Sequence, residues 1–319
     1  MLSRGQRFLF LAAAIAPALL PLFLIWRYGV NMPYMDEWGF VRDLHLANER
    51  GQISSHLFTQ FNESRPAVSR LLFLALAKLS GGDFRAPMLT SWVVACLTAW
   101  NLWKLVKPQN DWLHLSAAAL ASLLVFSPIQ YENWLWGNQV IVLLPMLYLT
   151  SALRILQSHR LSANMSLATA LALGAAAMYS FSGGLFVLPA IAVGMIVLWP
   201  HWKAKKTIAL TLWTLTFAAC AAFYFRGYVS PAHHPSMTVG LLSPVKTIQY
   251  FLLFLGSVHG NGEPLVAMLA GLTLLALAVT LGQRGHPAIQ ILVGFVLSSA
   301  AVTALGRVGF GLEQSLSVT

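Results

Sequence analysis

Long apolar runs separated by short polar segments dominate the chain from end to end. Nine of these runs approach the length of about 20 residues that a helix needs to cross a hydrocarbon core of about 30 Å. They cover residues 8–26, 86–103, 113–126, 139–156, 164–181, 184–199, 207–224, 264–281 and 288–305. The pattern predicts an all-α fold, a polytopic transmembrane helical bundle with about nine spans.

Two further apolar stretches are too short to span a membrane comfortably. Residues 67–79 contain Arg70, and residues 247–258 lie between Lys246 and His259. Apolar segments of about 10 to 14 residues are typical of interfacial or re-entrant helices. We therefore expect two such helices beside the nine spans.

The composition narrows the class of protein further. Hydrophobic residues make up 57% of the 319 residues and charged residues only 9%, whereas about 25% of the residues in a soluble domain are charged. This excludes a water-soluble globular enzyme and a disordered chain. Both cysteines, Cys96 and Cys220, lie inside apolar runs, which excludes a disulfide scaffold. We expect a single integral membrane domain over residues 1–319, with a long extracytoplasmic loop at residues 27–85.

The charges separate by side when the nine spans alternate across the membrane. With the N-terminus inside, the cytoplasmic segments and Arg154 hold ten Lys or Arg residues and one acid, Asp111, and the outside holds ten cations and nine acids. Short cytoplasmic loops are rich in Lys and Arg. The net charge of +10 therefore predicts a multi-pass protein of the bacterial inner membrane with a cytoplasmic N-terminus, and not a partner of nucleic acids.

The long first loop carries the pair that we consider the candidate catalytic residues, Asp36 and Glu37. Five of the ten acids lie in its first part, residues 27–65, and this pair comes about ten residues after the first span. A carboxylate that is desolvated on one side at the headgroup plane could act as a general base or hold a divalent metal ion near a lipid phosphate. The competing interpretation is a solvated acidic dipeptide that opens a helix.

Three other groups of residues are candidates for substrate binding. Arg65 and Arg70 could hold a phosphate, because a planar guanidinium suits that anion, although Glu63 and Arg65 could simply neutralise each other. Residues 131–139 combine aromatic faces with amides and a carboxylate, as sugar sites do, although an interfacial Trp belt has similar aromatics. Arg307 could contact an anionic substrate or snorkel to headgroups. The predicted substrate-binding residues are Asn62, Glu63, Arg65, Glu132, Asn133, Trp134, Asn138, Gln139 and Arg307.

Several chemistries have no motif in the sequence. P-loop, Rossmann and HExxH signatures are absent. The adjacent pair His233 and His234 lacks the spacing of metal ligands on a helix, so we predict no metal site there. Few acids lie inside the spans, which weighs against an ion-coupled transporter.

The chain resembles the GT-C superfamily of integral membrane glycosyltransferases. The resemblance rests on Asp36 and Glu37 soon after the first span, on the ordered motifs at residues 34–38, 62–65 and 131–139, and on the N-in topology. It is similar to an uncharacterised bacterial branch with an N-E-H-R-like motif. Ser64 stands where that motif has His, so the role of the His is not carried over.

The resemblance implies a GT-C-like fold and a reaction at the outer leaflet. The donor would be a polyprenyl-phosphate sugar and the acceptor a cell-envelope hydroxyl. Asp36 would act as the general base and Glu37 would orient the acceptor, while Arg65 and Arg307 would bind the departing phosphate and the 131–139 loop the sugar. Because GT-C proteins have more spans than this chain, the resemblance also implies a C-terminally truncated member. The alternative function is a lipid or glycan transporter, or a non-catalytic membrane subunit on the same scaffold.

Overall fold

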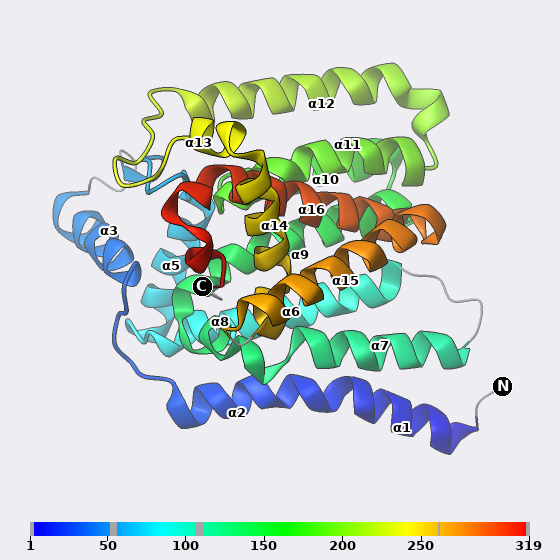
Figure 1. Ribbon diagram of the computed structural model, residues 1–319. Coiled ribbons are helices and arrows are strands. Elements are labelled where there is room, and N and C mark those ends of the chain that lie inside the picture. The colour runs from blue at the N-terminus through cyan, green and yellow to red at the C-terminus, as the bar shows by residue number, and fades with distance from the viewer. Residues whose placement is uncertain (1–2, 52–55, 106–110, 261, 317–319) are drawn as a thin grey trace. The chain divides into compact units, whose positions relative to one another are not determined.

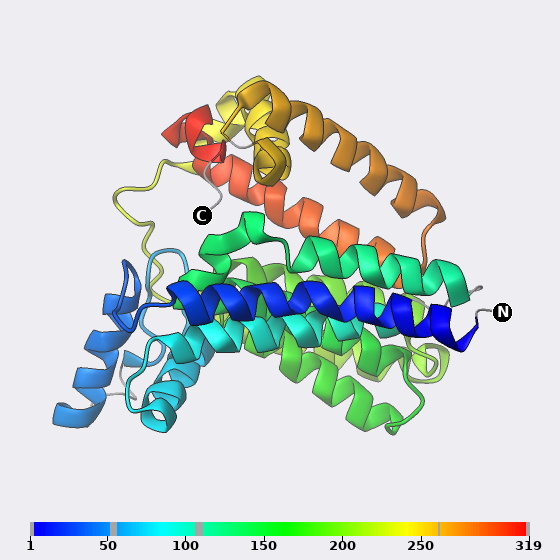
Figure 2. The ribbon, with the colours of Figure 1, turned by 90° about the horizontal axis from the view of Figure 1, so that it is seen from below.

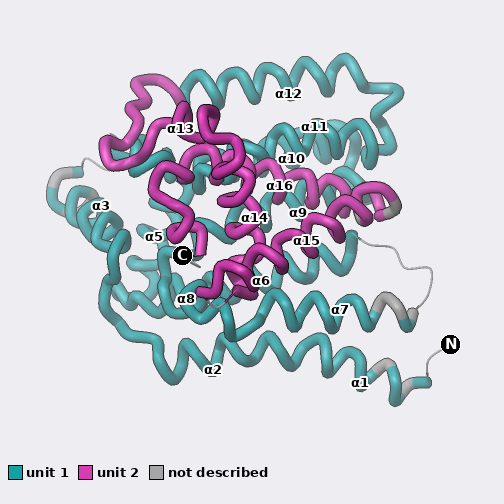
Figure 3. The backbone as a smooth tube through the Cα atoms, viewed as in Figure 1, with its two compact units in different colours: residues 1–224 teal, residues 225–319 magenta. Residues whose placement is uncertain are grey.

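The computed structural model describes residues 3–51, 56–105, 111–260 and 262–316 (Figure 1). Over these ranges the chain consists of α-helices, short 3₁₀ helices and connecting loops, without a strand, which confirms the predicted all-helical class. The chain divides into two compact units, residues 1–224 and 225–319 (Figure 3), and each is described by itself.

The first unit contains most of the helices. They are α1 (Arg4–Ile15), α2 (Leu19–Tyr28), α3 (Glu37–Arg50), α5 (Ala67–Ser80), α6 (Arg85–Leu105), α7 (Asp111–Val125), α8 (Tyr131–Leu135), α9 (Val140–Gln157), α10 (Ala163–Met178), α11 (Val187–Leu198) and α12 (Trp202–Phe225). The 3₁₀ helices of this unit are η1 (Ala16–Ala18), η2 (Pro128–Gln130), η3 (Gly137–Gln139) and η4 (Ser182–Phe186). The expected interfacial helix at residues 67–79 is α5.

Each predicted span falls on helical structure, but fewer than nine helices are long and apolar enough to cross a membrane. Five segments meet both criteria, or six if a bent pair of helices counts as one span. The five are Phe8–Tyr28, Leu115–Leu135, Gly137–Gln157, Trp202–Phe225 and Pro287–Phe310. The segments Ala163–Met178 and Ser182–Leu198 are apolar but shorter, and α6 buries the polar residues Ser91, Thr98 and Asn101 among its neighbours. The described residues therefore support five to six spans.

The core of the first unit forms around α9. This helix packs against α6, α10 and α11, and α1 packs against α7. One hydrophobic cluster joins Phe40 of α3 and Phe73 of α5 to Val94 of α6 and Val140 of α9. The rings of Phe40 and Phe73 stack with their centroids 3.8 Å apart. This cluster packs α3 and α5, the helices of the first loop, against the apolar helices α6 and α9.

The connections of the first unit lie at two opposite ends (Figures 1 and 2). One end holds the start of α1, the last turns of α6 and α9 and the start of α12, whereas the other holds α3, α5, α8 and η3. The second end carries seven acids, which are Asp36, Glu37, Asp43, Glu49, Glu63, Asp83 and Glu132. We call this end of the first unit the acidic end. Seven of the eight acids of the first unit thus lie at one end of its helices.

The second unit is built on a close crossing of two helices. It contains α13 (Met237–Leu242), α14 (Pro244–Gly260), α15 (Pro264–Arg284), α16 (Pro287–Arg307), η5 (Val308–Phe310) and η6 (Leu312–Leu316). A Cβ added at Gly256 of α14 would lie 1.9 Å from the main-chain oxygen of Ala267 in α15, so only glycine permits this approach. The segments Pro244–Gly260 and Pro264–Thr280 are bent by 105° relative to each other. The short apolar stretch at residues 247–258 is therefore helical, as expected, and belongs to a broken or re-entrant pair.

Candidate functional site

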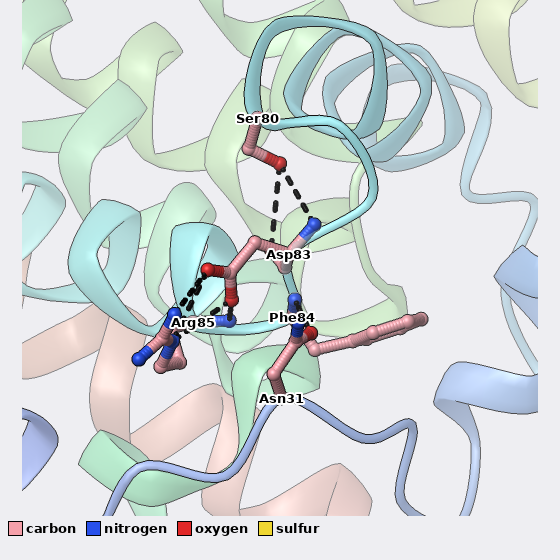
Figure 4. A network of polar contacts seen from close by, with 5 residues as sticks. All are labelled: Asn31, Ser80, Asp83, Phe84 and Arg85. Carbon is pink, nitrogen blue, oxygen red and sulfur yellow. Dashed lines mark hydrogen bonds and ion pairs between the residues drawn. The ribbon is translucent and has the colours of Figure 1, made fainter.

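The loop between α2 and α3 is fixed at both of its ends. The backbone N–H of Gly29 donates to the carbonyl oxygen of Ile25 at 2.9 Å and closes α2. The side-chain oxygen of Asn31 accepts a hydrogen bond of 2.8 Å from the backbone N–H of Phe84, at the start of α6 (Figure 4). Asp36 then directly precedes α3, and Glu37 is its first residue. The acid pair is therefore presented by a short, anchored loop that leaves a candidate span.

The turn between α5 and α6 supports this loop. The hydroxyl of Ser80 accepts from the backbone N–H of Asp83 at 3.1 Å, and the carboxylate of Asp83 pairs with Arg85, with Nη2 2.6 Å from Oδ2 (Figure 4). The Arg85 guanidinium lowers the pKa of Asp83 below its ordinary value. Because this pair is largely exposed, it fixes local geometry and adds little to stability.

Glu37 is a carboxyl without exposed surface. Its Oε2 accepts a hydrogen bond of 2.8 Å from the backbone N–H of Tyr34. Its Oε1 is also buried, makes no hydrogen bond of regular geometry and lies against Gly137, where an added Cβ would be 2.7 Å from that oxygen. The side chain therefore holds the start of α3 against η3 and requires glycine at residue 137.

The burial of Glu37 changes its protonation. Desolvation raises its pKa above the ordinary 4.5, and the nearby backbone N–H groups of Tyr34, Asn138 and Gly137 lower it in part. Burial disfavours the charged form of a carboxyl. Predicted as a catalytic residue, Glu37 has no surface through which to touch a substrate in this structure, and its visible role is to position α3.

Asp36, by contrast, is partly exposed, and the charge of another acid acts on it. Burial raises the pKa of its carboxyl, and the negative charge of Glu63 raises it further. The side chain of Asp36 makes no capping hydrogen bond to the first turn of α3. The motifs at residues 34–38 and 62–65 thus lie close enough for the charge of Glu63 to act on Asp36.

Backbone strain accompanies both of these carboxylates. Met35 (φ 45°) and Asn62 (φ 49°) are the non-glycine residues with positive φ in the described ranges, and they directly precede Asp36 and Glu63. Asn adopts this conformation readily, whereas an unbranched apolar residue does so at a cost of about 1–2 kcal/mol. Such strain is concentrated at functional sites because the surrounding structure must maintain it.

The turn that carries Glu63 is anchored by its own neighbours. Phe61 and Ser64 exchange two backbone hydrogen bonds of 2.8 and 2.9 Å, which places Asn62 and Glu63 at the tip. The hydroxyl of Ser64 accepts from the backbone N–H of Ser182 at 3.0 Å. The hydroxyl of the buried Tyr224 donates to the carbonyl oxygen of Glu63 at 2.6 Å. This region of the first loop is therefore tied to η4 and to the end of α12.

Arg65 and Arg70 hold the structure together at this end. Arg65 donates through Nε to the carbonyl oxygen of Tyr224 and through Nη1 to that of Phe58. The side chain of Arg70 is 1% exposed, and its Nε lies 2.7 Å from Oδ2 of Asp43. The predicted phosphate contact of Arg70 is wrong, because its guanidinium is enclosed in this ion pair. Arg65 is predicted to bind substrate and is seen to fix the turn.

The third motif, residues 131–139, divides into a buried and an accessible part. Trp134 is 1% exposed and donates through Nε1 to the carbonyl oxygen of Ser127 at 3.3 Å. Asn138 and Gln139 are buried as well, so their predicted contacts with a substrate would require movement of η3. Glu132 and Asn133 keep accessible surface. Trp134, Asn138 and Gln139 thus belong to the core of the first unit, and Glu132 and Asn133 are accessible.

An aromatic pair that sequence reasoning missed joins the first and third motifs. The rings of Tyr34 and Trp136 pack edge to face with centroids 5.8 Å apart, and Tyr34 is more than half exposed. Tyr34 lies in the motif at residues 34–38 and Trp136 in the motif at residues 131–139, but nothing in the sequence around either residue indicates that their rings are in contact. Arg307, the last predicted binding residue, ends α16 in the second unit. The site described here therefore consists of Asp36, Glu63, Tyr34 and Trp136, with Glu37 beneath them.

The site does not provide a metal centre by the usual count of ligands. In the part of the chain that the structure describes, no group of three or more His, Cys, Asp or Glu side chains gathers to hold an ion.

Comparisons with protein-family models, with curated proteins and with solved structures find no match to this chain.

Removing the buried cation at the acidic end tests its structural role. We expect Arg70→Met to lower the free energy of unfolding by about 3–5 kcal/mol, because Asp43 is left charged and buried. Arg42→Gln is the matched control, because Arg42 also contacts Asp43, at 3.4 Å, but is mostly exposed. That change should cost less than about 1 kcal/mol. Equal effects of the two variants in detergent unfolding experiments would contradict the assignment.

The buried carboxyl of Glu37 predicts a pH dependence of stability. Because its pKa is raised in the folded protein, the folded state binds this proton more tightly than the unfolded chain does. The stabilising contribution is present below pH 4.5 and is lost as the pH rises through the folded-state pKa. Melting temperatures measured against pH should therefore fall less steeply above pH 4.5 in Glu37→Gln than in the wild type. Glu49→Gln, which removes an exposed ion pair with His45 on α3, should change the slope much less, because exposed ion pairs add little to stability.

Proposed function

We propose that the chain is a membrane glycosyltransferase of GT-C-like type, which transfers a sugar from a polyprenyl-phosphate donor to a hydroxyl of a cell-envelope acceptor. The observation that carries the proposal is the state of Asp36. Its carboxyl is partly exposed and desolvated, the negative charge of Glu63 acts on it, and it follows a candidate span by a short anchored loop. A carboxylate with a raised pKa at the membrane surface is suited to accept a proton from a hydroxyl.

The reaction assigns one step to this carboxylate. The acceptor oxygen attacks the anomeric carbon of the donor, and the bond from that carbon to the phosphate oxygen breaks. The acceptor proton passes to the Asp36 carboxylate, and polyprenyl phosphate leaves with the bonding electron pair. Glu63 favours this proton transfer, because its negative charge stabilises the protonated form of Asp36.

The surrounding residues supply orientation and binding. The exposed ring of Tyr34, with Trp136 beside it, offers a face for a sugar ring, and Glu132 and Asn133 are accessible on the same motif as Trp136. Aromatic faces and nearby amide or carboxylate groups are a suitable combination for a hydroxylated ring. Glu37 and Arg65 act as positioning residues, because their contacts are with the protein itself. Asn62 adds a polar side chain at the tip of the turn.

The proposed membrane orientation follows from the charges of the first unit. Its acidic end would face outward, and the end that contains Lys104, Arg154 and Lys203 would face the cytoplasm, as the positive-inside rule requires. This orientation in a bacterial inner membrane would place Asp36 where a lipid-linked donor is presented. Membrane lipids and the lipid-linked sugar are then the expected partners.

Replacing the proposed base tests the function. We expect Asp36→Asn to reduce sugar transfer from polyprenyl-phosphate donors by at least about 100-fold, because an amide cannot take up the proton. Donor binding and the melting temperature should be retained. Glu49→Gln, which removes an exposed acid from α3, the helix that Asp36 precedes, should leave transfer unchanged.

Two outcomes would contradict the proposal. Unchanged transfer by Asp36→Asn would exclude Asp36 as the base. Movement of the lipid-linked sugar across vesicle membranes without a transfer product would instead identify the alternative function, a transporter. Both experiments use the full chain in detergent or vesicles.

A further inference from the structure

A polar cluster lies between α6 and α9, at the end of the first unit opposite the acidic end. Arg154 is in the last turn of α9, inside the candidate span Gly137–Gln157. Its Nη1 donates to Oδ1 of Asn101 at 2.8 Å. The amide nitrogen of Asn101 donates in turn to Oγ of Ser151 at 2.8 Å. Because Asn101 is buried and held by Ser151, its oxygen is fixed in the position that orients Arg154.

The guanidinium of Arg154 has donors beyond this one bond. An arginine side chain carries five N–H groups, and Arg154 is only partly buried. The structure places no carboxylate within ion-pair distance of it among the residues described. The sequence has no Asp or Glu from residue 133 to residue 262, and only Asp111 between residues 84 and 131. A cation inside a membrane span is costly unless an anion or water meets it, so such a residue indicates a binding function.

A second cation and two tryptophans lie at the end of α6, the helix that carries Asn101. Lys104 is three residues after Asn101 on α6, so the two lie on neighbouring positions of one helix face. The Lys104 ammonium lies 4.5 Å and 4.0 Å from the ring centroids of Trp100 and Trp103. Tryptophan is enriched at the level of lipid headgroups. The cluster therefore has the residue types that are typical of the headgroup level.

We propose that Arg154 and Lys104 form a binding site for the phosphate of an anionic phospholipid, between the ends of α6 and α9. Arg154 would bind the phosphate with the N–H groups that Asn101 leaves available, and Lys104 would add a second positive charge. Basic pockets between transmembrane helices bind anionic headgroups in this way. Trp100 and Trp103 would lie beside the glycerol region. This site is independent of the proposed transferase reaction.

Two simpler explanations make different predictions. Cations near helix C-termini also interact with the helix dipole, which would stabilise α6 and α9 without any ligand. A general attraction of basic residues to anionic lipid would depend on the number of charges and not on their positions. A specific site requires that Arg154 matter more than an equally charged arginine nearby.

Lipid binding to the purified full chain tests the proposal. Native mass spectrometry in a neutral detergent would measure the binding of phosphatidylglycerol, with phosphatidylcholine and inorganic phosphate as separate probes. We expect selective binding of phosphatidylglycerol, and an affinity at least about fivefold lower in Arg154→Gln, since one headgroup contact is worth about 1 kcal/mol. Lys104→Gln, at an exposed position, should also weaken binding while keeping the fold.

Arg160→Gln is the matched control, because it removes the same charge from the exposed connection after α9. It should leave the affinity for phosphatidylglycerol unchanged. Equal losses in Arg160→Gln and Arg154→Gln would overturn the site in favour of general attraction. Equal binding of phosphatidylcholine, or displacement of the lipid by millimolar inorganic phosphate, would also overturn it. Unchanged binding in both Arg154→Gln and Lys104→Gln would assign the two cations to the helix dipoles alone.

Discussion

The ion pair between Arg70 and Asp43 is the interaction on which the acidic end of the first unit depends. The guanidinium of Arg70, on α5, also donates to the carbonyl oxygens of Leu57 and Thr59, at 3.0 and 2.6 Å. One side chain therefore fixes α3 and the segment that leads to Glu63. A buried ion pair contributes little net stability, because desolvation offsets the attraction, but it selects one geometry strongly. The segments that carry Asp36 and Glu63 both adjoin the elements that this ion pair joins.

Packing supplies the energy that keeps the strained segments of this end in place. The stacked rings of Phe40 and Phe73 bury apolar surface between α3 and α5, and Tyr224 closes the turn that holds Glu63. These contacts are sufficient to maintain positive φ at Met35 and Asn62, each of which costs about 1–2 kcal/mol or less. The carboxyl that we propose as the base is thus carried by loops that are hydrogen-bonded to the surrounding elements. Such anchoring is what a precisely placed base requires.

The sequence predicts the helices well, because the length of an apolar run can be read from neighbouring residues alone. It predicts nine spans, whereas five or six of the described segments are long and apolar enough, because α10 and α11 are short and α6 contains polar residues such as Asn101. The position of the acids in one loop was also predictable. The different environments of Asp36 and Glu37 were not, because they depend on the contact between α3 and Gly137, which is distant in sequence. The same contact determines the burial of Asn138.

The central claim is that Asp36 and Glu63 share one electrostatic site. Its most direct test is an infrared titration of the Asp36 carboxyl in detergent, with the band identified by its loss in an Asp36→Asn sample. The account predicts a midpoint above the ordinary pKa of 3.8 in the wild type, and a lower midpoint in Glu63→Gln because a negative charge is removed. The same midpoint in both proteins, or a wild-type midpoint at or below 3.8, would contradict the account.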